Sequence, residues 1–382
     1  MKGKADSGFA AFNSAITVLA GALAGTLVRG ADFPLWTFIW DNYVQLLSAQ
    51  ILIAFALACF AYVRSFSVVA GNAEGRELAA GGHSGNLIYD WFIGRELNPR
   101  VTLPLVGEVD IKSFMELRPG MLGWILLDLA FVARQYTLFG SVSDSMVLIV
   151  AFQSLYVLDA LYMEPAMLTT MDIATDGFGF MLAFGDLAWL PFIYSLQARY
   201  LAIYPVHLGL SGVAGVLAVQ AFGYWIFRST NNEKNRFRTN PKDPKVKHLE
   251  YIKTSSGGKL LVSGWWGTAR HINYLGDWIM AWSYCLPTGI AGYLVQHSSP
   301  VPSTGQSPVD GGVMGGVPVS TTVTQGAARG WGMVVTYFYL VYFAVLLIHR
   351  EMRDEAKCRR KYGKDWDVYT NKVRWRILPG VY

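Results

Sequence analysis

Apolar runs long enough to cross a bilayer recur along the whole chain. A membrane-spanning helix needs about 20 predominantly apolar residues, and runs near that length lie at residues 9–27, 46–63, 121–139, 146–168, 178–204, 208–227, 275–295 and 331–348. Several contain Gly, Pro or acidic residues, which membrane helices tolerate where neighbours or water satisfy the polar groups. The pattern predicts an all-α, polytopic integral membrane bundle of about eight to ten transmembrane helices.

Four polar stretches interrupt this pattern and divide the chain. Residues 65–118 are mixed and include the glycine-rich "AAGGHSGN", residues 228–264 are basic, residues 296–329 are rich in Gly, Ser, Pro, Thr and Val, and residues 349–382 form a basic tail. We therefore expect N-terminal membrane spans in 1–64, an amphipathic connector in 65–118 and a larger membrane domain in 119–382. The composition of 296–329 is typical of a flexible loop with no visible function.

Positive charge orients the predicted bundle. The basic loop 228–264 and the basic tail 349–382 are separated by two apolar runs, so both lie on the same side of the membrane. Lysine and arginine near helix ends mark the cytosolic side. The segment 296–329 has Arg329 as its only Lys or Arg and is expected on the opposite side.

The composition agrees with a membrane protein. Hydrophobic residues make up 53% of the 382 positions and charged residues 15%, whereas soluble domains carry about 25% charged residues. The three cysteines, Cys59, Cys285 and Cys358, are too widely spaced to indicate a disulfide framework or a metal site. We expect the lipid bilayer as a partner, and neither a metal nor a nucleic acid.

Hydrogen-bonding side chains gather in three segments of the predicted cytosolic side. One is a pair of cations four residues apart, which lie on one face of a helix; the second is the stretch "WGTARHINY" (266–274); the third is a helical face of the tail, with residues at i, i+4, i+7 and i+8. The residues concerned are Lys234 and Arg238; Trp266, Asn273 and Tyr274; and Asp354, Cys358, Lys361 and Tyr362.

These residue types together suit a ligand with phosphates, hydroxyls and a flat ring. Lysine and arginine bind phosphate, Asp or Asn accepts from ribose hydroxyls, and aromatic rings stack on heterocycles. A dinucleotide fits that description, but the chain lacks the glycine spacing and the strand–helix setting of a dinucleotide fingerprint. The pocket would therefore be built from helix ends and loops. The alternative is that the cations set topology or contact lipid headgroups, while 266–274 forms an interfacial belt with a capped helix start.

A second group of candidate residues lies inside or beside the apolar runs between residues 154 and 186. A carboxylate at the centre of a membrane helix costs about 2.5–3.5 kcal/mol, so these acids are expected to face a cavity, pair with a cation or be protonated. A carboxylic acid kept neutral by an apolar site is a usable general acid. The alternative is that they hold helices together through hydrogen bonds. The candidates are Asp159, Glu164, Asp172, Asp176 and Asp186, with Tyr156 and Tyr162 as further proton donors.

Long motifs place the chain beside a known family. The segments "LLVSGWWGTARHINYLGD" and "HREMRDEAKCRRKYGKDWDVYTNKVRWRILPGVY" resemble the sterol reductases, which include C14, C7 and C24 reductases and the lamin B receptor. The resemblance covers most of residues 86–382, and "GRELNPR", "ELRPGMLGW" and "TTMDIATDGFGFMLAFGD" are similar to the C14 branch. The long loop 296–329 suggests a fungal-type member, and the spans in 1–64 are short relative to the family.

The resemblance implies an NADPH-dependent delta(14)-sterol reductase of the endoplasmic reticulum or nuclear membrane, with a sterol as substrate and other sterol-biosynthesis enzymes as candidate partners. It makes 119–382 the catalytic domain, with its cofactor pocket facing the cytosol, and it places Arg350 in that pocket or beside it. The family's nucleotide contacts carry over onto Lys234, Arg238, Leu261, Trp266, Asn273, Tyr274, Asp354, Cys358, Arg359, Arg360, Lys361, Tyr362 and Tyr369.

The implied chemistry needs an acid, because an isolated alkene accepts hydride only after protonation. The sequence leaves open which of the acids or tyrosines donates that proton. It also leaves open a C7 or C24 reductase, a protein that only binds sterol, a scaffold similar to the lamin B receptor, and a methyltransferase similar to isoprenylcysteine carboxyl methyltransferases. Lys234 and Arg238 argue against the methyltransferase, because its methyl donor has no phosphates.

Overall fold

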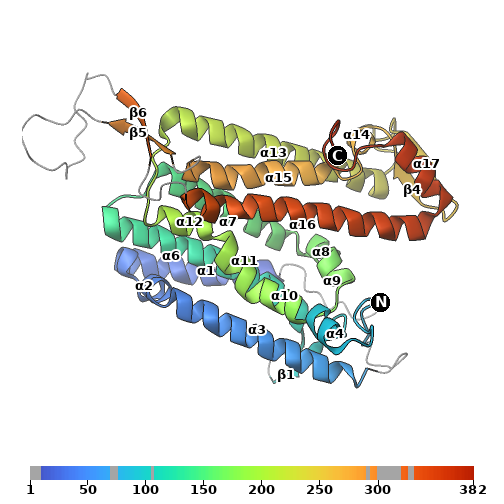
Figure 1. The fold of residues 1–382 in the computed structure, drawn as a ribbon, viewed down its shortest axis with the longest axis horizontal. Coiled ribbons are helices and arrows are strands. Elements are labelled where there is room, and N and C mark those ends of the chain that lie inside the picture. The colour runs from blue at the N-terminus through green and yellow to red at the C-terminus, as the bar shows by residue number, and fades with distance from the viewer. Residues whose placement is uncertain (1–9, 69–75, 105–106, 290–292, 299–319, 326–330) are drawn as a thin grey trace, which may run out of the picture. The chain divides into compact units, whose positions relative to one another are not determined.

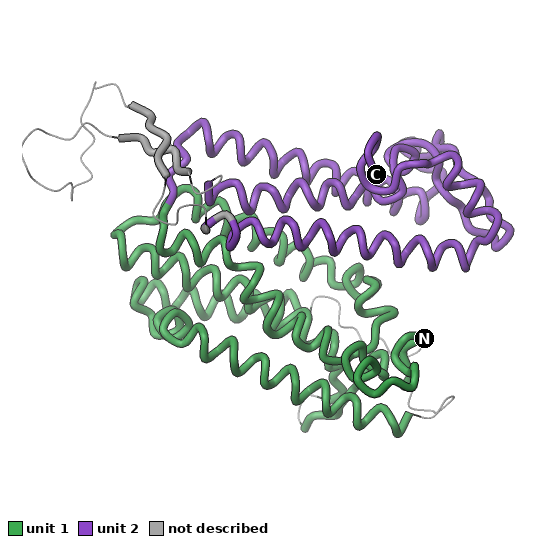
Figure 2. The backbone as a smooth tube through the Cα atoms, viewed as in Figure 1, with its two compact units in different colours: residues 1–205 green, residues 206–382 purple. Residues whose placement is uncertain are grey.

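The chain folds as a helical membrane protein with seven helical segments that are long and apolar enough to cross a bilayer, counted over the described residues. The computed structural model describes residues 10–68, 76–104, 107–289, 293–298, 320–325 and 331–382. It divides into two compact units, residues 1–205 and 206–382 (Figure 2). The prediction of a polytopic helical bundle is confirmed.

One predicted span is shorter than expected. The apolar run 275–295 forms helix α15, Ile272–Cys285, which is followed by a 3₁₀ turn, η4, at Leu286–Thr288. Pro287 has no N–H to continue the helix, and Gly289 adopts φ 90°, which leaves the helical region. The result is a helix of 14 residues, below the length that crosses a bilayer unaided.

The first unit consists of long helices linked by short ones and one hairpin. Its elements are α1 Ala10–Arg29, η1 Gly30–Asp32, α2 Pro34–Asp41, α3 Tyr43–Ser65, α4 Leu87–Ile93, β1 Arg100–Leu103, β2 Gly107–Asp110, α5 Ile111–Met115, η2 Glu116–Gly120, α6 Met121–Phe139, α7 Asp144–Tyr162, α8 Glu164–Met167, α9 Met171–Ala174, α10 Phe180–Phe184, η3 Gly185–Trp189, α11 Leu190–Tyr194 and α12 Leu196–Leu201 (Figure 1).

Two spans of this unit contain a turn of π-helix. In η2 the turn includes Pro119, and η3 is followed at once by Pro191 in α11. Because proline lacks the N–H that continues an α-helix, the local ladder widens, and such turns are frequent at functional sites. The hydrophobic pattern does not register them, since the apolar run continues through both.

The core of the first unit is organised around Trp124. This side chain is fully buried and packs with Leu117, Val157 and Leu161. Its indole N–H donates to Oε1 of Gln153 at 3.1 Å, and the Gln153 amide donates to the carbonyl of Tyr194. The two buried side chains Trp124 and Gln153 are thereby hydrogen-bonded, as burial requires.

The backbone of the motif "GRELNPR" packs closely against that of "TDGFGF", and glycines make this approach possible. Gly94 ends α4 with φ 96°, and a Cβ there would collide with the backbone of residues 177–179. Phe178 N donates to the carbonyl of Glu96, whose carboxylate forms a buried ion pair with Arg76 at 2.8 Å. This contact fixes the chain that leads into α10.

Among its described residues, the second unit has two long helices, α13 and α16, and the shorter helix α15, with small sheets and short helices at their ends. Its elements are α13 Gly209–Thr239, β3 Tyr251–Lys253, β4 Lys259–Leu261, α14 Trp265–Thr268, α15, η4, β5 Tyr293–Ser298, β6 Ser320–Gln325, α16 Trp331–Tyr362 and α17 Lys364–Lys372. Helices α13 and α15 approach closely at Gly223 and Gly276, where a Cβ would lie 2.8 Å and 2.6 Å from backbone nitrogen of the other helix. Small residues allow such contacts between membrane helices.

Within the predicted loop 296–329, the described ends form structure. Strands β5 and β6 pair antiparallel, with Tyr293 opposite Gln325 and Ser298 opposite Ser320. The β6 sequence "STTVTQ" is rich in β-branched residues, which favour strands. Residues 299–319 and 326–330 of this loop lie outside the described residues.

Candidate functional site

A pocket in the second unit brings together the three segments expected to form a ligand site. It has a volume of about 250 Å³, which is smaller than a typical cofactor cavity, so a dinucleotide would extend beyond it. Its walls come from the end of α13, from β4 and α14, and from α16 and α17. The lining residues are Lys234, Phe237, Arg238, Lys259, Leu260, Leu261, Trp266, Arg270, His271, Asp354, Lys357, Cys358, Lys361, Tyr362, Trp366 and Tyr369.

Nine of the predicted cofactor residues line this pocket: Lys234, Arg238, Leu261, Trp266, Asp354, Cys358, Lys361, Tyr362 and Tyr369. The others lie elsewhere in the unit. Asn273 and Tyr274 stand in the first turn of α15, Arg350 lies one turn before Asp354 on α16, and Arg359 and Arg360 are exposed on other faces of that helix.

The helical period explains this sorting. Helix α16 runs to Tyr362, and Gly363 ends it with φ 52°. Positions i, i+3, i+4 and i+7 share one face, and Asp354, Lys357, Cys358 and Lys361 fit that series. Lys357 was missed although its spacing placed it on the predicted face. Arg359 instead pairs with Glu355 at 3.7 Å.

Lys234 and Trp266 form a cation–π contact in the pocket. The Lys234 Nζ atom lies 3.7 Å from the centre of the Trp266 ring. The indole N–H donates to the carbonyl of Thr230 at 2.9 Å, and the ring is buried against Phe237 and Leu261. The cation is therefore held over a ring that cannot rotate.

Arg270 serves to connect the pocket wall to the last residues of the chain. Its Nη1 donates to the carbonyls of Val373 and Arg374 at 2.9 and 3.1 Å, and its Nη2 lies 3.4 Å from Glu355. The backbone nitrogen of Arg270 also donates to Trp375 O. These bonds join segments about a hundred residues apart, so sequence spacing alone could not reveal them.

His271 is a neutral side chain at the edge of the cation cluster. Burial, together with the positive charges of Lys234 and Arg270, lowers its pKa from 6.5 to about 3. Its Nε2 lies 3.7 Å from Asp354 Oδ2, but a neutral imidazole makes no ion pair there. The ring stacks on Tyr274 at 5.1 Å between centroids, which places Tyr274 directly behind the pocket wall.

Aromatic rings form the opposite wall. Trp366 stacks on Tyr362 at 6.1 Å and donates its indole N–H to Glu355 at 2.9 Å. Tyr369 is buried beside it, and burial raises the pKa of its hydroxyl. At the start of α17, Asp365 accepts hydrogen bonds from the backbone and hydroxyl of Ser255, both at 2.7 Å, and these bonds lower its pKa. The β3–β4 hairpin is thereby attached to α17.

The donor set fits a phosphate-bearing ligand with a flat ring. Arg270 is occupied by its bonds to the end of the chain. Five other cationic side chains line the pocket: Lys234, Arg238, Lys259, Lys357 and Lys361. Asp354 is the acid among the lining residues. Such a cluster attracts anions, and the indole and phenol rings offer stacking surfaces. Behind the wall, Asn273 Oδ1 is buried with no hydrogen-bond partner among the described residues.

The candidate acids all lie in the first unit, mostly where helices are broken. Tyr156, Asp159 and Tyr162 belong to α7, Asp172 to α9 and Asp186 to η3, while Asp176 lies between α9 and α10. Glu164 is buried and accepts the backbone N–H of Ala11 at 3.0 Å. A carboxylate at a helix N-terminus stabilises that end, so Glu164 has a structural bond to α1.

Two charged residues near these acids were missed by the sequence analysis. Lys112 is fully buried, and its Nζ donates to the carbonyls of Asp172, Ile173 and Asp176 at 2.9, 2.9 and 2.6 Å. Glu116 begins η2 one helical turn later. The motif "ELRPGMLGW" contained Glu116, but nothing in its spacing connected it with residue 186.

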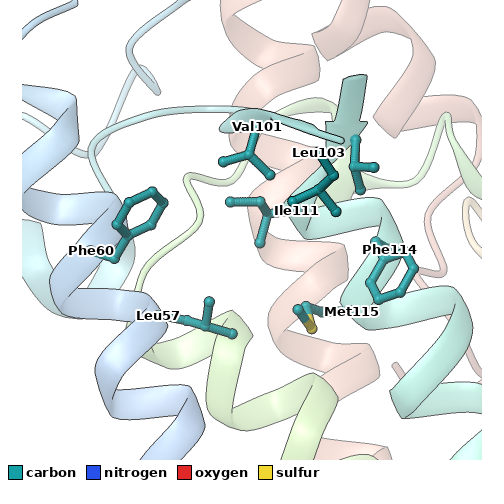
Figure 3. Close-up of a pocket in the computed structure, with 8 residues that line it drawn as sticks. Leu57, Phe60, Val101, Leu103, Ile111, Phe114 and Met115 are labelled. Carbon is teal, nitrogen blue, oxygen red and sulfur yellow. The ribbon is translucent and has the colours of Figure 1, made fainter. Parts of the chain in front are cut away.

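A separate pocket of the first unit is wholly apolar. Its volume is about 390 Å³, and Figure 3 shows side chains of α3, β1 and α5 turned toward it. The lining residues are Leu57, Phe60, Val101, Leu103, Val109, Ile111, Phe114 and Met115. It offers a surface for hydrocarbon and no group for chemistry.

Comparison with known proteins adds an independent finding. Residues 7–382 match the model of a family described as the ergosterol biosynthesis ERG4/ERG24 family. A delta(14)-sterol reductase of Septoria lycopersici is 59% identical over 391 residues, covering 98% of this chain and 73% of that protein. A delta(14)-sterol reductase of Neurospora crassa is 59% identical, with 97% and 74% covered. A third, from Aspergillus fumigatus, is 59% identical, with 98% and 72% covered.

Proposed function

The chain belongs to the ergosterol biosynthesis ERG4/ERG24 family, and we propose on this premise that it is a delta(14)-sterol reductase that takes its hydride from NADPH. The enzyme reduces the C14=C15 double bond of a sterol intermediate. The names of relatives at 59% identity support the reaction. The choice of NADPH is supported by the pocket of the second unit.

One observation carries the cofactor assignment: Lys234, Arg238, Asp354 and Lys361, from two helices more than a hundred residues apart, line the same pocket with Trp266. The cations would hold the phosphates, because charge-assisted bonds to phosphate are strong. Asp354 would accept ribose hydroxyls, and Trp266, Tyr362 and Trp366 would flank the flat rings. When bound, NADPH supplies the hydride of the reaction.

The protein itself must supply a proton to the sterol double bond, so that the sterol can accept the hydride. Adding a proton to C15 leaves a tertiary cation at C14, and this step needs a side chain that holds a proton at neutral pH. The candidates are four acids of the first unit: Asp176 and Asp186, which are buried, and Asp159 and Asp172, which are half-buried. The apolar helices around them exclude water, which would compete for the cation.

The membrane setting follows from the same assignment. The seven apolar helical segments found among the described residues suit a multi-pass protein whose sterol substrate arrives from the bilayer. We place it in the endoplasmic reticulum membrane or the continuous nuclear envelope, with its cofactor pocket on the cytosolic side. Other enzymes of sterol biosynthesis would be its neighbours there.

The test is reduction of a defined sterol by the purified full-length protein. In detergent micelles with NADPH, an 8,14-diene sterol should lose its C14=C15 double bond, and the same protein should restore 14-reduced sterols in cells that lack this activity. Persistence of the 8,14-diene despite good expression would contradict the assignment. Sterols unsaturated at C7 or C24 test the related reductases, and tighter binding of S-adenosylmethionine than of NADPH would favour the methyltransferase.

A further inference from the structure

Two turns of π-helix pack against each other in the first unit, and each carries a carboxyl group. Glu116 is the first residue of η2 and Asp186 the second of η3. At the contact, a Cβ on Gly120 would lie 2.9 Å from the carbonyl oxygen of Asp186 and 3.2 Å from the side chain of Leu190. Glycine therefore permits the two turns to meet backbone to backbone.

Asp186 differs from most buried acids of its unit. Asp90 accepts bonds from Ser84 and Gly85, and Glu96 is paired with Arg76. Asp186 is 8% exposed, and its Oδ2 has no hydrogen-bond partner in the part of the chain that the structure describes. Burying a carboxylate oxygen without a donor is costly, and this favours the protonated form.

The charged groups that face Asp186 make the same point. They are the carboxyls of Glu116 and Asp172 and the ammonium of Lys112. Lys112 directs its Nζ to three backbone carbonyls, which uses the three N–H bonds that it has. Ionising all three carboxyls around this one cation is costly, because their negative charges repel one another. One of the three carboxyls therefore keeps a proton.

We propose that Asp186 is the catalytic acid that protonates the sterol double bond, and that Glu116 is a positioning residue that returns the proton to it across the paired π turns. This inference rests on the proposed reductase function. The O–H bond of Asp186 breaks, and the electron pair of the double bond forms the C15–H bond. The cation left at C14 is neutralised by the hydride that the reductase activity supplies. The Asp186 carboxylate then takes a proton from Glu116, which is half-buried near the start of its span and regains one from water.

The test compares four variants in the full-length protein. Asp186→Asn should lower kcat by about 100-fold or more, the range for loss of a general acid, with the Kd for NADPH changed less than about threefold. Asp186→Glu should recover part of kcat and displace the pH at which kcat is half-maximal. Glu116→Gln should lower kcat about tenfold and enlarge the solvent deuterium isotope effect on kcat.

Asp128→Asn is the matched control. Asp128 is also buried and unpaired within the described chain, but it lies in regular helix. This variant should keep kcat within about threefold of the parent.

Two outcomes would overturn the proposal. One is an Asp186→Asn variant with kcat near that of the parent. The other is a loss that Asp186→Glu does not recover and that Asp128→Asn reproduces, since this marks a structural role. A parent protein active only on another sterol double bond would contradict the proposed function instead, and the same variants assayed on that double bond would still test Asp186.

Discussion

The ammonium nitrogen of Lys234 lies 3.7 Å from the centre of the Trp266 ring. A cation over an indole face gains about 0.5–2 kcal/mol, more where water is excluded. Because the indole is itself bonded to the carbonyl of Thr230, the ring that attracts the charge is in place before any ligand arrives. Such preorganisation reduces the entropy lost on binding.

The first prediction concerns this charge. Lys234→Ala should raise the KM for NADPH about 10- to 100-fold, because a hydrogen bond to a charged group contributes about 1.5–3 kcal/mol, while kcat at saturating NADPH stays within about threefold. Lys247→Ala is the control, since Lys247 is exposed in the same basic loop but outside the pocket. Steady-state kinetics in micelles measure both variants. Equal effects of the two changes would show that Lys234 acts only through general surface charge.

The second prediction concerns salt. Lys357 and Lys361 line the pocket from α16 and are exposed, so ions screen them. Raising NaCl from 0.05 to about 0.5 M should weaken NADPH binding, and replacing both lysines with glutamine should weaken it at low salt and flatten the salt dependence. Fluorescence titration gives the Kd at each salt concentration. An unchanged slope in the double variant would argue against phosphate contacts at these positions.

Helical periodicity predicts which residues share a face of one helix, but it does not predict contacts between different elements. It placed Lys234 with Arg238, and Asp354 with Cys358 and Lys361, and these residues line the pocket. It could not find Arg270 as the link to Val373 and Trp375, because that role depends on contacts about a hundred residues apart.

The same limit applies to the first unit. Lys112 would pass for an interfacial positive charge in the sequence, yet it is fully buried over three carbonyls. The π turns at Glu116 and Asp186 do not interrupt the apolar pattern, so the sequence did not predict them. The length of the apolar run 275–295 suggested a full span, but α15 ends early, before Pro287 and Gly289.

The third prediction tests the glycine contact that holds "GRELNPR". Gly94→Ala should lower the free energy of unfolding by more than about 2 kcal/mol, because φ 96° is strained for alanine and its Cβ would collide with the backbone of residues 177–179. Gly81→Ala, where a Cβ meets nothing within 4 Å, should leave stability unchanged. The apparent melting temperature in micelles distinguishes them, and similar values for both variants would contradict the contact.

The fourth prediction concerns pH and rests on His271. Its pKa is about 3 in the folded protein and 6.5 for the ordinary side chain, so the unfolded chain binds the proton more tightly. The stability that this neutral histidine contributes is therefore fully present above pH 6.5 and is lost as the pH falls from 6.5 toward 3. From the difference between the two pKa values, the free energy of unfolding should fall by about 2 kcal/mol between pH 7.5 and pH 5.

His271→Gln removes this titration and should flatten the fall in melting temperature between pH 7.5 and 5, even if the variant is less stable at pH 7.5. His248→Gln is the matched control, because His248 is also a histidine of the second unit but is exposed. It should keep the slope of the parent protein. A His271→Gln variant with that same slope would mean that other groups cause the acid sensitivity. The neutral imidazole beside Lys234 and Arg270 would then have no part in it, and the charge balance of the pocket would have to be explained without His271.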